Sequence, residues 1–462
     1  MVKKKTAVQD SMTAFEKRAA ISLASIYAMR MLGLFMILPV FVLYADQFSG
    51  ATPVLTGIAI GVYGLTQAVL QIPFGMLSDR FGRKPVIYTG LLIFAVGSVV
   101  AAMSESIYGV ILGRALQGSG AIAAALMALT ADLTREDHRT KAMAVIGMTI
   151  GFSFALSMIL GPLLNQWVGV PGIFWITAFL ALLGIVLVKV WVPNPTVSKF
   201  HRDTEPVPSQ FRSVLSDKQL LRLDFGVLAL HMILTATFVV LPLALRDHAQ
   251  LESVKHWYVY LPVLLLSMGA MVPFIIVAES KRRMKQVFVS AVLVVCLSEA
   301  ALVWFYDSLI AIIVVLFAFF TAFNVLEASL PSLVAKISPP DRKGTSMGVY
   351  SSSQFFGAFL GGMIGGWVFE HYSFTGVFSF CSFVAVIWFL FAATMQNPRY
   401  LSTHMINLGK VNEADVSQLV VRLTQITGVA EAIVIAEDGI AYLKVDLNAM
   451  DREALNKFSV DT

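Results

Sequence analysis

Long apolar stretches recur along most of this 462-residue chain, and each of them is about 20 residues long. A helix of that length crosses the hydrocarbon core of a bilayer. Only 14% of the residues are charged, whereas soluble domains usually contain roughly 25%. The sequence therefore predicts an all-α polytopic membrane protein.

Twelve segments are long enough to cross the membrane. The first contains Arg30 and is not followed by a small-residue cleavage site, so we interpret it as a retained helix rather than a signal peptide. A proline-containing linker, 193–218, separates an N-terminal half, 1–192, from a C-terminal half, 219–397. The segments cover residues 19–45, 55–76, 85–104, 107–131, 140–165, 171–192, 219–246, 253–278, 285–306, 308–335, 344–369 and 373–396.

Lysine and arginine are distributed very unequally between the connections on the two sides of this predicted bundle. One set of connections holds 24 of them, whereas the alternate set holds only Arg246 and Lys255. Positively charged loops stay on the cytoplasmic side of a membrane. We therefore expect a protein of the bacterial inner membrane with both termini in the cytoplasm. The net charge of +5 follows from this topology, and we expect no nucleic-acid partner.

The last residues, 401–462, differ from the rest because they are polar. An apolar run at 432–435 and an alternating run at 440–446 flank a Glu-Asp-Gly turn signal. Apolar residues at helical spacing precede them between 416 and 426. The order strand, helix, strand, strand, helix predicts a small cytoplasmic α+β module of the ferredoxin-like type.

This module carries a net charge of −4 and would lie beneath a basic membrane face. We therefore expect it to dock on that face or to mediate self-association. It contains no cysteine, which excludes a thiolate metal site within it. The two cysteines of the chain, Cys296 and Cys381, both lie in apolar spans and lack metal-ligand spacing. We predict neither a metal nor a cofactor.

The turn between the second and third segments, 75–85, carries an acid, three bases and two glycines. We place it at the membrane surface, because the hydrocarbon core cannot hold so many charges. We expect Asp79 to meet the N-terminus of the helix that starts near Gly344, and the bases to pair with Asp132 and Glu136. Such a latch would hold the two halves closed on the cytoplasmic side; the alternative is that the charges only anchor the turn. The predicted switch residues are Gly75, Asp79, Arg80, Gly82, Arg83, Lys84 and Asp132.

Parts of this pattern recur in the second half of the chain. Glu279–Lys285 echoes Asp79–Lys84, and Arg342–Met347 echoes Arg139–Met143. Two parallel six-helix repeats explain such echoes. Folds of this kind place the substrate site near the membrane midplane, between the two halves.

Ionisable residues are rare inside the predicted spans, where they are costly and usually functional. Glu327 is the sharpest candidate, because Asn324 shares its helix face and burial favours the protonated carboxyl group. We interpret it as a proton or cationic-substrate site; the alternative is a permanently paired structural charge. The other candidates for proton coupling or substrate binding are Arg30, Arg114, whose partner must come from another helix, His231 and Glu299.

Polar residues at helical spacing would line a central cavity. Tyr63, Gln67 and Gln71 recur at i, i+4 and i+8 and form one stripe on the second helix. Asn324 and Gln354 would add to it. The chain also contains 33 phenylalanines and 20 methionines, and a cavity partly lined by them would suit amphipathic or hydrophobic solutes.

Four motifs resemble those of the major facilitator superfamily. Asp79–Lys84 is similar to its signature loop, and Arg114–Ala121 is similar to its fourth-helix motif. Leu32–Pro39 resembles the first-helix motif of its drug/proton antiporters. Its fifth-helix antiporter motif is matched in part, with Leu164-Asn165 where a glycine pair is usual, by Gly147, Gly151, Gly161 and Pro162.

The resemblance covers residues 19–396 and implies proton-driven export of a small solute by alternating access between two pseudo-symmetric six-helix halves. The departure at Leu164-Asn165 leaves antiport itself open. A second hypothesis is a membrane sensor that signals through the C-terminal module. We do not expect an enzyme, because the sequence contains neither a paired catalytic constellation nor a Gly-Lys-Ser/Thr phosphate loop.

Overall fold

The computed structural model describes residues 12–194, 207–339, 342–397, 401–409, 411–436, 439–446, 449–451, 454–455 and 457–458. Four predicted features lie outside these residues in whole or in part. They are the middle of the linker, the acidic pair of the turn signal in the module, most of the last helix of the module, and the side chain of Glu136.

Helices fill most of the described chain, and their bounds follow the apolar segments. Ten helical stretches among the described residues are long and apolar enough to cross a membrane, which confirms the predicted helical membrane architecture in outline. The helices are α1 (Ala14–Phe35), α2 (Phe41–Tyr44), α3 (Pro53–Phe81), α4 (Arg83–Ala102), α5 (Ile107–Ser119), α6 (Ala123–Asp132), α7 (Glu136–Val190), α8 (Phe211–Val214), α9 (Lys218–Leu243), α10 (Trp257–Ser280), α11 (Met284–Phe305), α12 (Leu309–Ile337) and α13 (Lys343–Ala393).

Helices α7 and α13 are far longer than one crossing requires, and each contains a break. α7 has 55 residues, and Gly169 inside it has a non-helical backbone with φ 65°. The residues at both ends of α7 bind the start of α1, through Glu16 and Arg18, so α7 doubles back on itself. Ser373 breaks α13, which has 51 residues, in the same way. The break at Gly169 falls between the spans predicted at 140–165 and 171–192, and Ser373 is the first residue of the span predicted at 373–396.

Two other predicted spans are interrupted. The first was expected over 19–45, but α1 ends at Phe35, and a turn that contains Pro39 separates it from α2. Proline lacks a backbone N–H and cannot continue a helical hydrogen-bond ladder. The fourth span is split between α5 and α6 at Gly120. A Cβ on Gly120 would lie 2.2 Å from the carbonyl oxygen of Gly90, so this glycine lets the fourth span approach α4 closely.

The C-terminal module contains strands β1 (Ser402–Asn407), β2 (Val429–Ile435) and β3 (Ile440–Val445) and helix α14 (Val416–Thr424). The strands form an antiparallel sheet in the order β1-β3-β2. This confirms the predicted order strand, helix, strand, strand. The last predicted helix lies mostly outside the described residues.

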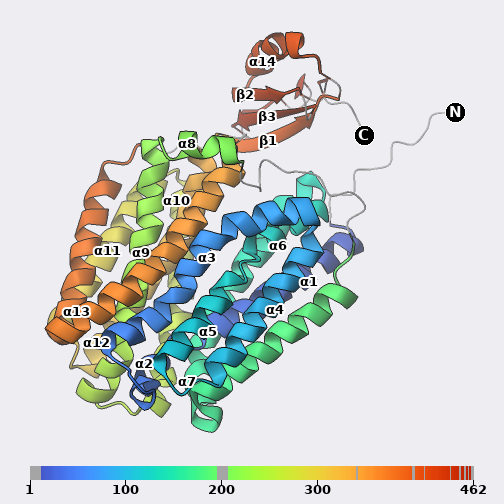
Figure 1. Cartoon of the computed structure of the whole chain (residues 1–462). Helices are drawn as coiled ribbons and strands as arrows, with labels where there is room; N and C mark the ends of the chain where they lie inside the picture. The colour runs from blue at the N-terminus through green and yellow to red at the C-terminus, as the bar shows by residue number, and fades with distance from the viewer. Residues whose placement is uncertain are drawn as a thin grey trace.

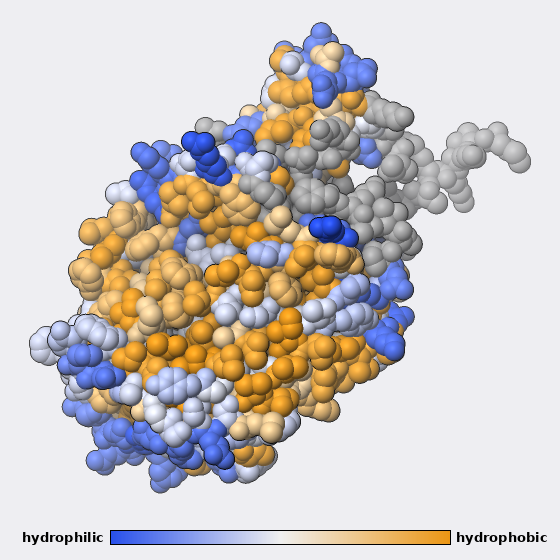
Figure 2. Space-filling view, in the orientation of Figure 1, coloured by the Kyte–Doolittle hydropathy of each residue, from blue (hydrophilic) through white to orange (hydrophobic). Residues whose placement is uncertain are grey.

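Figure 1 shows the module at one end of the helical bundle, beside α8, with α2 at the opposite end. We call these the module end and the far end. Figure 2 shows apolar side chains across the body of the bundle and hydrophilic side chains toward its two ends. A bilayer around the body of the bundle accounts for this distribution.

The N-terminal helices α1–α7 and the C-terminal helices α9–α13 meet closely toward the far end. A Cβ on Gly57 of α3 would lie only 2.0 Å from the carbonyl oxygen of Gly362 of α13. Gln166 Nε2 donates to the carbonyl oxygen of Val254 at 3.3 Å. These contacts join the two sets of helices, and Gln166 lies close to the break of α7 at Gly169.

Candidate functional site

Glu327 on α12 lies in a polar cluster with side chains from α9 and α13. Gln354 Nε2 donates to Glu327 Oε1 at 3.1 Å and lies 2.8 Å from His231 Nε2. His231 Nε2 is also 3.8 Å from Glu327 Oε2. The structure therefore brings three of the predicted site residues together from three different helices.

The hydrogen bonds of this cluster determine the tautomer of His231. Its Nδ1 lies 3.1 Å from the carbonyl oxygen of Val227, which can only accept, so Nδ1 carries a proton. Nε2 then accepts the amide of Gln354. The side chain of Glu327 is 37% exposed, whereas that of His231 is 14% exposed. A carboxylate, an amide and an imidazole thus form one hydrogen-bonded cluster.

Arg30 on α1 is buried among amide and aromatic groups. Its NH2 donates to Gln67 Oε1 at 2.5 Å, and Gln67 Nε2 donates to Gln71 Oε1 at 3.2 Å. The guanidinium lies over the rings of Tyr63 and Phe94, at 5.9 and 5.8 Å from their centroids. Nε and NH1 of Arg30 have no hydrogen-bond partner among the described residues. Two nitrogens of this buried cation therefore remain available to a further acceptor.

Arg114 on α5 binds mainly backbone. Nε donates to the carbonyl oxygen of Ala59 at 3.2 Å, NH2 to that of Ile60 at 3.1 Å, and NH1 to Gln117 Oε1 at 3.0 Å. The guanidinium also lies 5.3 Å from the centroid of the Tyr63 ring. The sequence indicated an acid from another helix as the partner of Arg114, whereas the acceptors that the structure shows on another helix are backbone carbonyl oxygens of α3.

The two arginines and the Glu327 cluster lie on opposite sides of the contact between α3 and α13. Tyr63 faces both Arg30 and Arg114, and its ring centroid is 6.3 Å from that of Phe355. Phe355 follows Gln354 directly in α13. The site therefore has a cationic side on the N-terminal helices and an acidic side on the C-terminal helices.

Two other polar residues join neighbouring C-terminal helices. Asn324 Nδ2 donates to Ser267 Oγ on α10 at 3.2 Å. Glu299 on α11 is completely buried, and its Oε1 accepts the hydroxyl of Thr237 on α9 at 3.0 Å. These bonds connect α12 to α10 and α11 to α9.

Arg83 is the hub of the charged turn. It forms an ion pair with Asp79, its NH1 donates to Ser78 Oγ at 2.9 Å, and its Nε lies 3.3 Å from Asp132 Oδ2. The side chains of Arg83 and Asp132 are 3% and 0% exposed. The expected pair between this turn and the fourth span is therefore present. The ion pair of Asp79 is with Arg83, inside the same turn, and not with the start of α13 near Gly344.

The other two bases of the turn have different partners. Lys84 Nζ donates to the carbonyl oxygen of Val192 at 2.7 Å and to Asn194 Oδ1 at 2.6 Å. Arg80 lies over the ring of Phe81, 5.4 Å from its centroid. The sequence indicated acids for both bases. The structure shows instead that Lys84 ties the turn to the residues that follow α7.

Glycine fits the turn at both predicted positions. Gly82 joins α3 to α4 with φ 91°, a conformation that costs other residues free energy. Gly75 packs on α6, where a Cβ would lie 3.2 Å from Cβ of Ala124.

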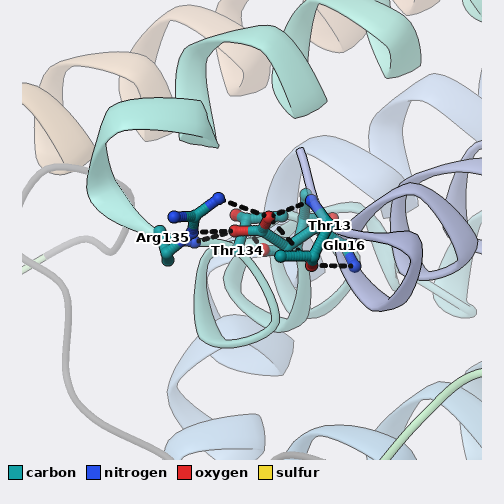
Figure 3. A network of polar contacts seen from close by, with 5 residues as sticks. Thr13, Glu16, Thr134 and Arg135 are labelled. Atoms are coloured by element: carbon teal, nitrogen blue, oxygen red, sulfur yellow. Dashed lines mark hydrogen bonds and ion pairs between the residues drawn. The ribbon is translucent and has the colours of Figure 1, made fainter. Parts of the chain in front are cut away.

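Sequence reasoning missed a second charged contact at the module end. Figure 3 shows Glu16 between Thr13 and Arg135. Arg135 Nε and backbone N donate to Glu16 Oε1 at 3.0 and 2.9 Å, and Thr13 forms a capping box with Glu16. These bonds fix the start of α1 to the start of α7. The Thr-x-x-Glu pattern at residues 13–16 was a visible signal for the cap, although not for its arginine partner.

The repeated turn in the second half shows the same kind of contact with the charges exchanged. Glu279 at the end of α10 accepts two hydrogen bonds from Lys336 Nζ near the end of α12, at 2.7 and 2.8 Å. In the first half, the base Arg83 of the turn binds the acid Asp132 at the end of α6. The turn thus braces the end of a helix in both halves of the sequence.

The glycines of the partial antiporter motif are in two different environments. A Cβ on Gly161 would lie 2.4 Å from the carbonyl oxygen of Met36, so this glycine packs tightly against the chain after α1. A Cβ on Gly147 or Gly151 would meet no described atom within 4 Å. Only the end of the motif nearer the far end is therefore in close contact here.

Comparison with known proteins places the chain in a family. The family described as Major Facilitator Superfamily matches residues 23–362 and 282–404. The inner membrane transport protein YajR of Escherichia coli is 48% identical over 441 residues, which are 96% of this chain and 97% of that protein. The multidrug resistance protein MdtH of Salmonella typhimurium is 24% identical over 77% of this chain and 90% of its own length.

Solved structures share the fold. A bacterial homologue of the human lysosomal transporter Spinster has a TM-score of 0.70 at 13% identity, over 84% of this chain and 98% of that chain. The human organic anion transporter MFSD10 has a TM-score of 0.59 at 18% identity, over 82% of this chain and 100% of that chain. These relatives are transporters and not enzymes. Because the family match spans more than half of the sequence, the chain belongs to the Major Facilitator Superfamily.

Proposed function

We propose that this chain is a proton-coupled secondary transporter of the bacterial inner membrane that exports small amphipathic or drug-like solutes. It would cross the membrane twelve times, with α7 and α13 supplying two crossings each, in two halves at 1–192 and 219–397. The surplus of Lys and Arg in the connections at the module end supports placing that end, and both termini, in the cytoplasm. The module would be a cytoplasmic ferredoxin-like domain.

The observation that carries the proposal is the cluster of Glu327, His231 and Gln354. A protonated Glu327 can donate a hydrogen bond, whereas the carboxylate only accepts. A proton on Oε2 could be donated to His231 Nε2, 3.8 Å away, whereas the carboxylate faces the lone pair of that nitrogen with another lone pair. Because these residues belong to α12, α13 and α9, a proton at Glu327 changes how three helices are held together. A proton gradient can drive a conformational change only through such a difference in binding.

In the proposed cycle, the conformation described here is open toward the cytoplasm. Its support is the close contact of α3 with α13 at the far end and the uncovered faces of Gly147, Gly151 and Gly269. The two halves would rock until these faces meet and the far end opens. Asp79 would then exchange Arg83 for the N-terminus of α13, which attracts an anion. This exchange is the proposed latch.

Aromatic rings near the acidic side support an amphipathic solute. Phe323 on α12 has its centroid 6.0 Å from the ring of His231 and 6.2 Å from that of Phe154 on α7. A solute with an apolar body and a positive group would contact these rings and replace the proton at Glu327. The similarity to a protein named for multidrug resistance supports the same class of solute.

Dye transport in inverted membrane vesicles tests the proposal. We expect vesicles with this chain to accumulate a lipophilic cationic dye when the lumen is made acidic. Glu327→Gln should abolish the response to the gradient, because an amide cannot exchange a proton. Glu413→Gln, an exposed change in the module, is the matched control and should leave it intact. Gradient-driven accumulation in Glu327→Gln would reject this role for the acid.

A membrane sensor is the second candidate, and contacts between the module and the helical bundle favour it. The same vesicles discriminate the two. A sensor would bind the dye without accumulating it, whatever the gradient.

A further inference from the structure

Both faces of β3, the central strand of the sheet in the C-terminal module, are covered. In β3, Ala441, Leu443 and Val445 belong to the apolar core that the sheet shares with α14. Side chains alternate between the faces of a strand, so Tyr442 and Lys444 point the other way. They are nevertheless only 3% exposed each. An antiparallel sheet with one face on its own helix usually leaves the other face to water. Another part of the chain must therefore cover this face.

The end of α12 covers Lys444. The ammonium donates to the carbonyl oxygens of Ala335 and Lys336 at 3.1 and 3.0 Å. Carbonyl groups in the last turn of a helix lack intrahelical partners and form the negative end of its dipole. Lys444 thus caps α12 from a different domain. Beside it, Asp446 lies 3.5 Å from Arg282, in the turn between α10 and α11.

A lysine is rarely buried unless its charge is paired or hydrogen-bonded. Burial and, to a smaller extent, the positive charge of Lys343 lower the pKa of Lys444 to about 8, while Glu431 on the neighbouring strand acts in the opposite direction. At pH 7 the ammonium is still the main form. Its two described acceptors belong to α12, so withdrawal of the module would remove both of them. Lys444 therefore makes these two hydrogen bonds only when the module lies against the end of α12.

The helix that Lys444 caps also carries Glu327. Glu327 precedes Ile337, the last residue of α12, by 10 residues, or about 15 Å along the helix axis. Lys336, whose carbonyl oxygen accepts from Lys444, binds Glu279 at the end of α10 through its side chain. The module, α12 and α10 are thus linked by one connected set of polar contacts through Lys336. A shift of α12 would displace these contacts.

We propose that the C-terminal module docks on the end of α12 through Lys444 and that its position follows the movements of this helix. The docking rests on the contacts alone. The second part rests on the proposed function, in which Glu327 changes its protonation during transport.

Spin labels in the full chain test the docking. Cysteines at Glu413 in the module and at Ser280 at the end of α10 would report their separation in lipid vesicles, since the two native cysteines are buried. We expect a narrow distribution for the parent chain and a broad, longer one for Lys444→Met, which keeps the stem but loses the donors. Lys457→Met, at an exposed lysine of the same module, should stay narrow. A narrow, unshifted distribution in Lys444→Met would overturn the docking.

A charge exchange between Asp446 and Arg282 distinguishes loss of docking from misfolding of the module. Asp446→Lys should broaden the distribution, because it faces Arg282 with a like charge. Adding Arg282→Glu should restore the narrow distribution, which a misfolded module could not do. Absence of this recovery would contradict the docking geometry.

The same labels test whether the module follows α12. Glu327→Gln, which imitates the protonated acid, should shift the main distance. An unchanged distance would overturn this second part and leave the docking intact. Dye accumulation is measured separately, so a failure of the proposed function would show there, whatever the distances are.

Discussion

Among single residues, Arg83 has the most constrained charge in the turn between α3 and α4. It faces Asp132, whose side chain is completely buried. Removal of one partner from a buried ion pair leaves an uncompensated charge and costs about 3–5 kcal/mol. We expect Arg83→Ala to lower the free energy of unfolding by about this amount, measured by denaturation in detergent. Arg80→Ala, which loses only a surface contact with Phe81, should cost less than about 1 kcal/mol. Equal losses of unfolding free energy in the two variants would contradict the assignment of the buried ion pair to Arg83 and Asp132.

The residue contacts differ in how far the sequence could predict them. The pair of Arg83 with Asp132 was predictable, because both residues lie at the ends of recognisable spans. The partners of Arg114 were not, because backbone carbonyl groups leave no signature in a sequence. The cluster of Glu327 and His231 was predicted as two separate candidates. Only the packing of α9 against α12 and α13 shows that they share Gln354.

Among the helices, the contact of α3 with α13 depends on glycine. A Cβ on Gly362 would lie 2.3 Å from the carbonyl oxygen of Gly57, whereas one on Gly151 would meet no described atom within 4 Å. We expect Gly362→Ala to separate the two helices and lower both thermal stability and dye transport. Gly151→Ala should keep the stability in this conformation. Under the proposed cycle it should slow transport, since its face must close. Comparable melting temperatures for the two variants would contradict the contact.

The helices themselves were largely predictable, since a bilayer requires about 20 apolar residues for each crossing. From the sequence alone, that rule predicts both legs of α7 and of α13. It failed inside the first span, where Pro39 follows a helix that has already ended at Phe35. Apolar content cannot reveal such a break, because the residues around Pro39 are as apolar as those within the helix.

For the whole molecule, the distribution of Lys and Arg makes a prediction about orientation. Single cysteines at Gln250, between α9 and α10, and at Glu413 in the module should lie on opposite sides of the membrane. We expect an impermeant maleimide to label position 250 in intact spheroplasts and position 413 only in inverted vesicles. Labelling of both from the same side would exclude the predicted topology.

The breaks at Gly169 and Ser373 have a mechanical consequence for the whole molecule. A single non-helical residue joins the two legs of α7, and another joins those of α13. Such a short connection leaves the two legs of each helix little freedom to move separately at the far end. A leg of about 25 residues is about 37 Å long. The bonds of Glu16 and Arg18 hold both ends of α7 at the start of α1, so the N-terminal helices would rotate together, and a rotation of about 10° about the far end moves their other ends by about 6 Å. Opening or closing a gap between the two halves at the module end thus requires only a modest rotation, with every helical turn left intact.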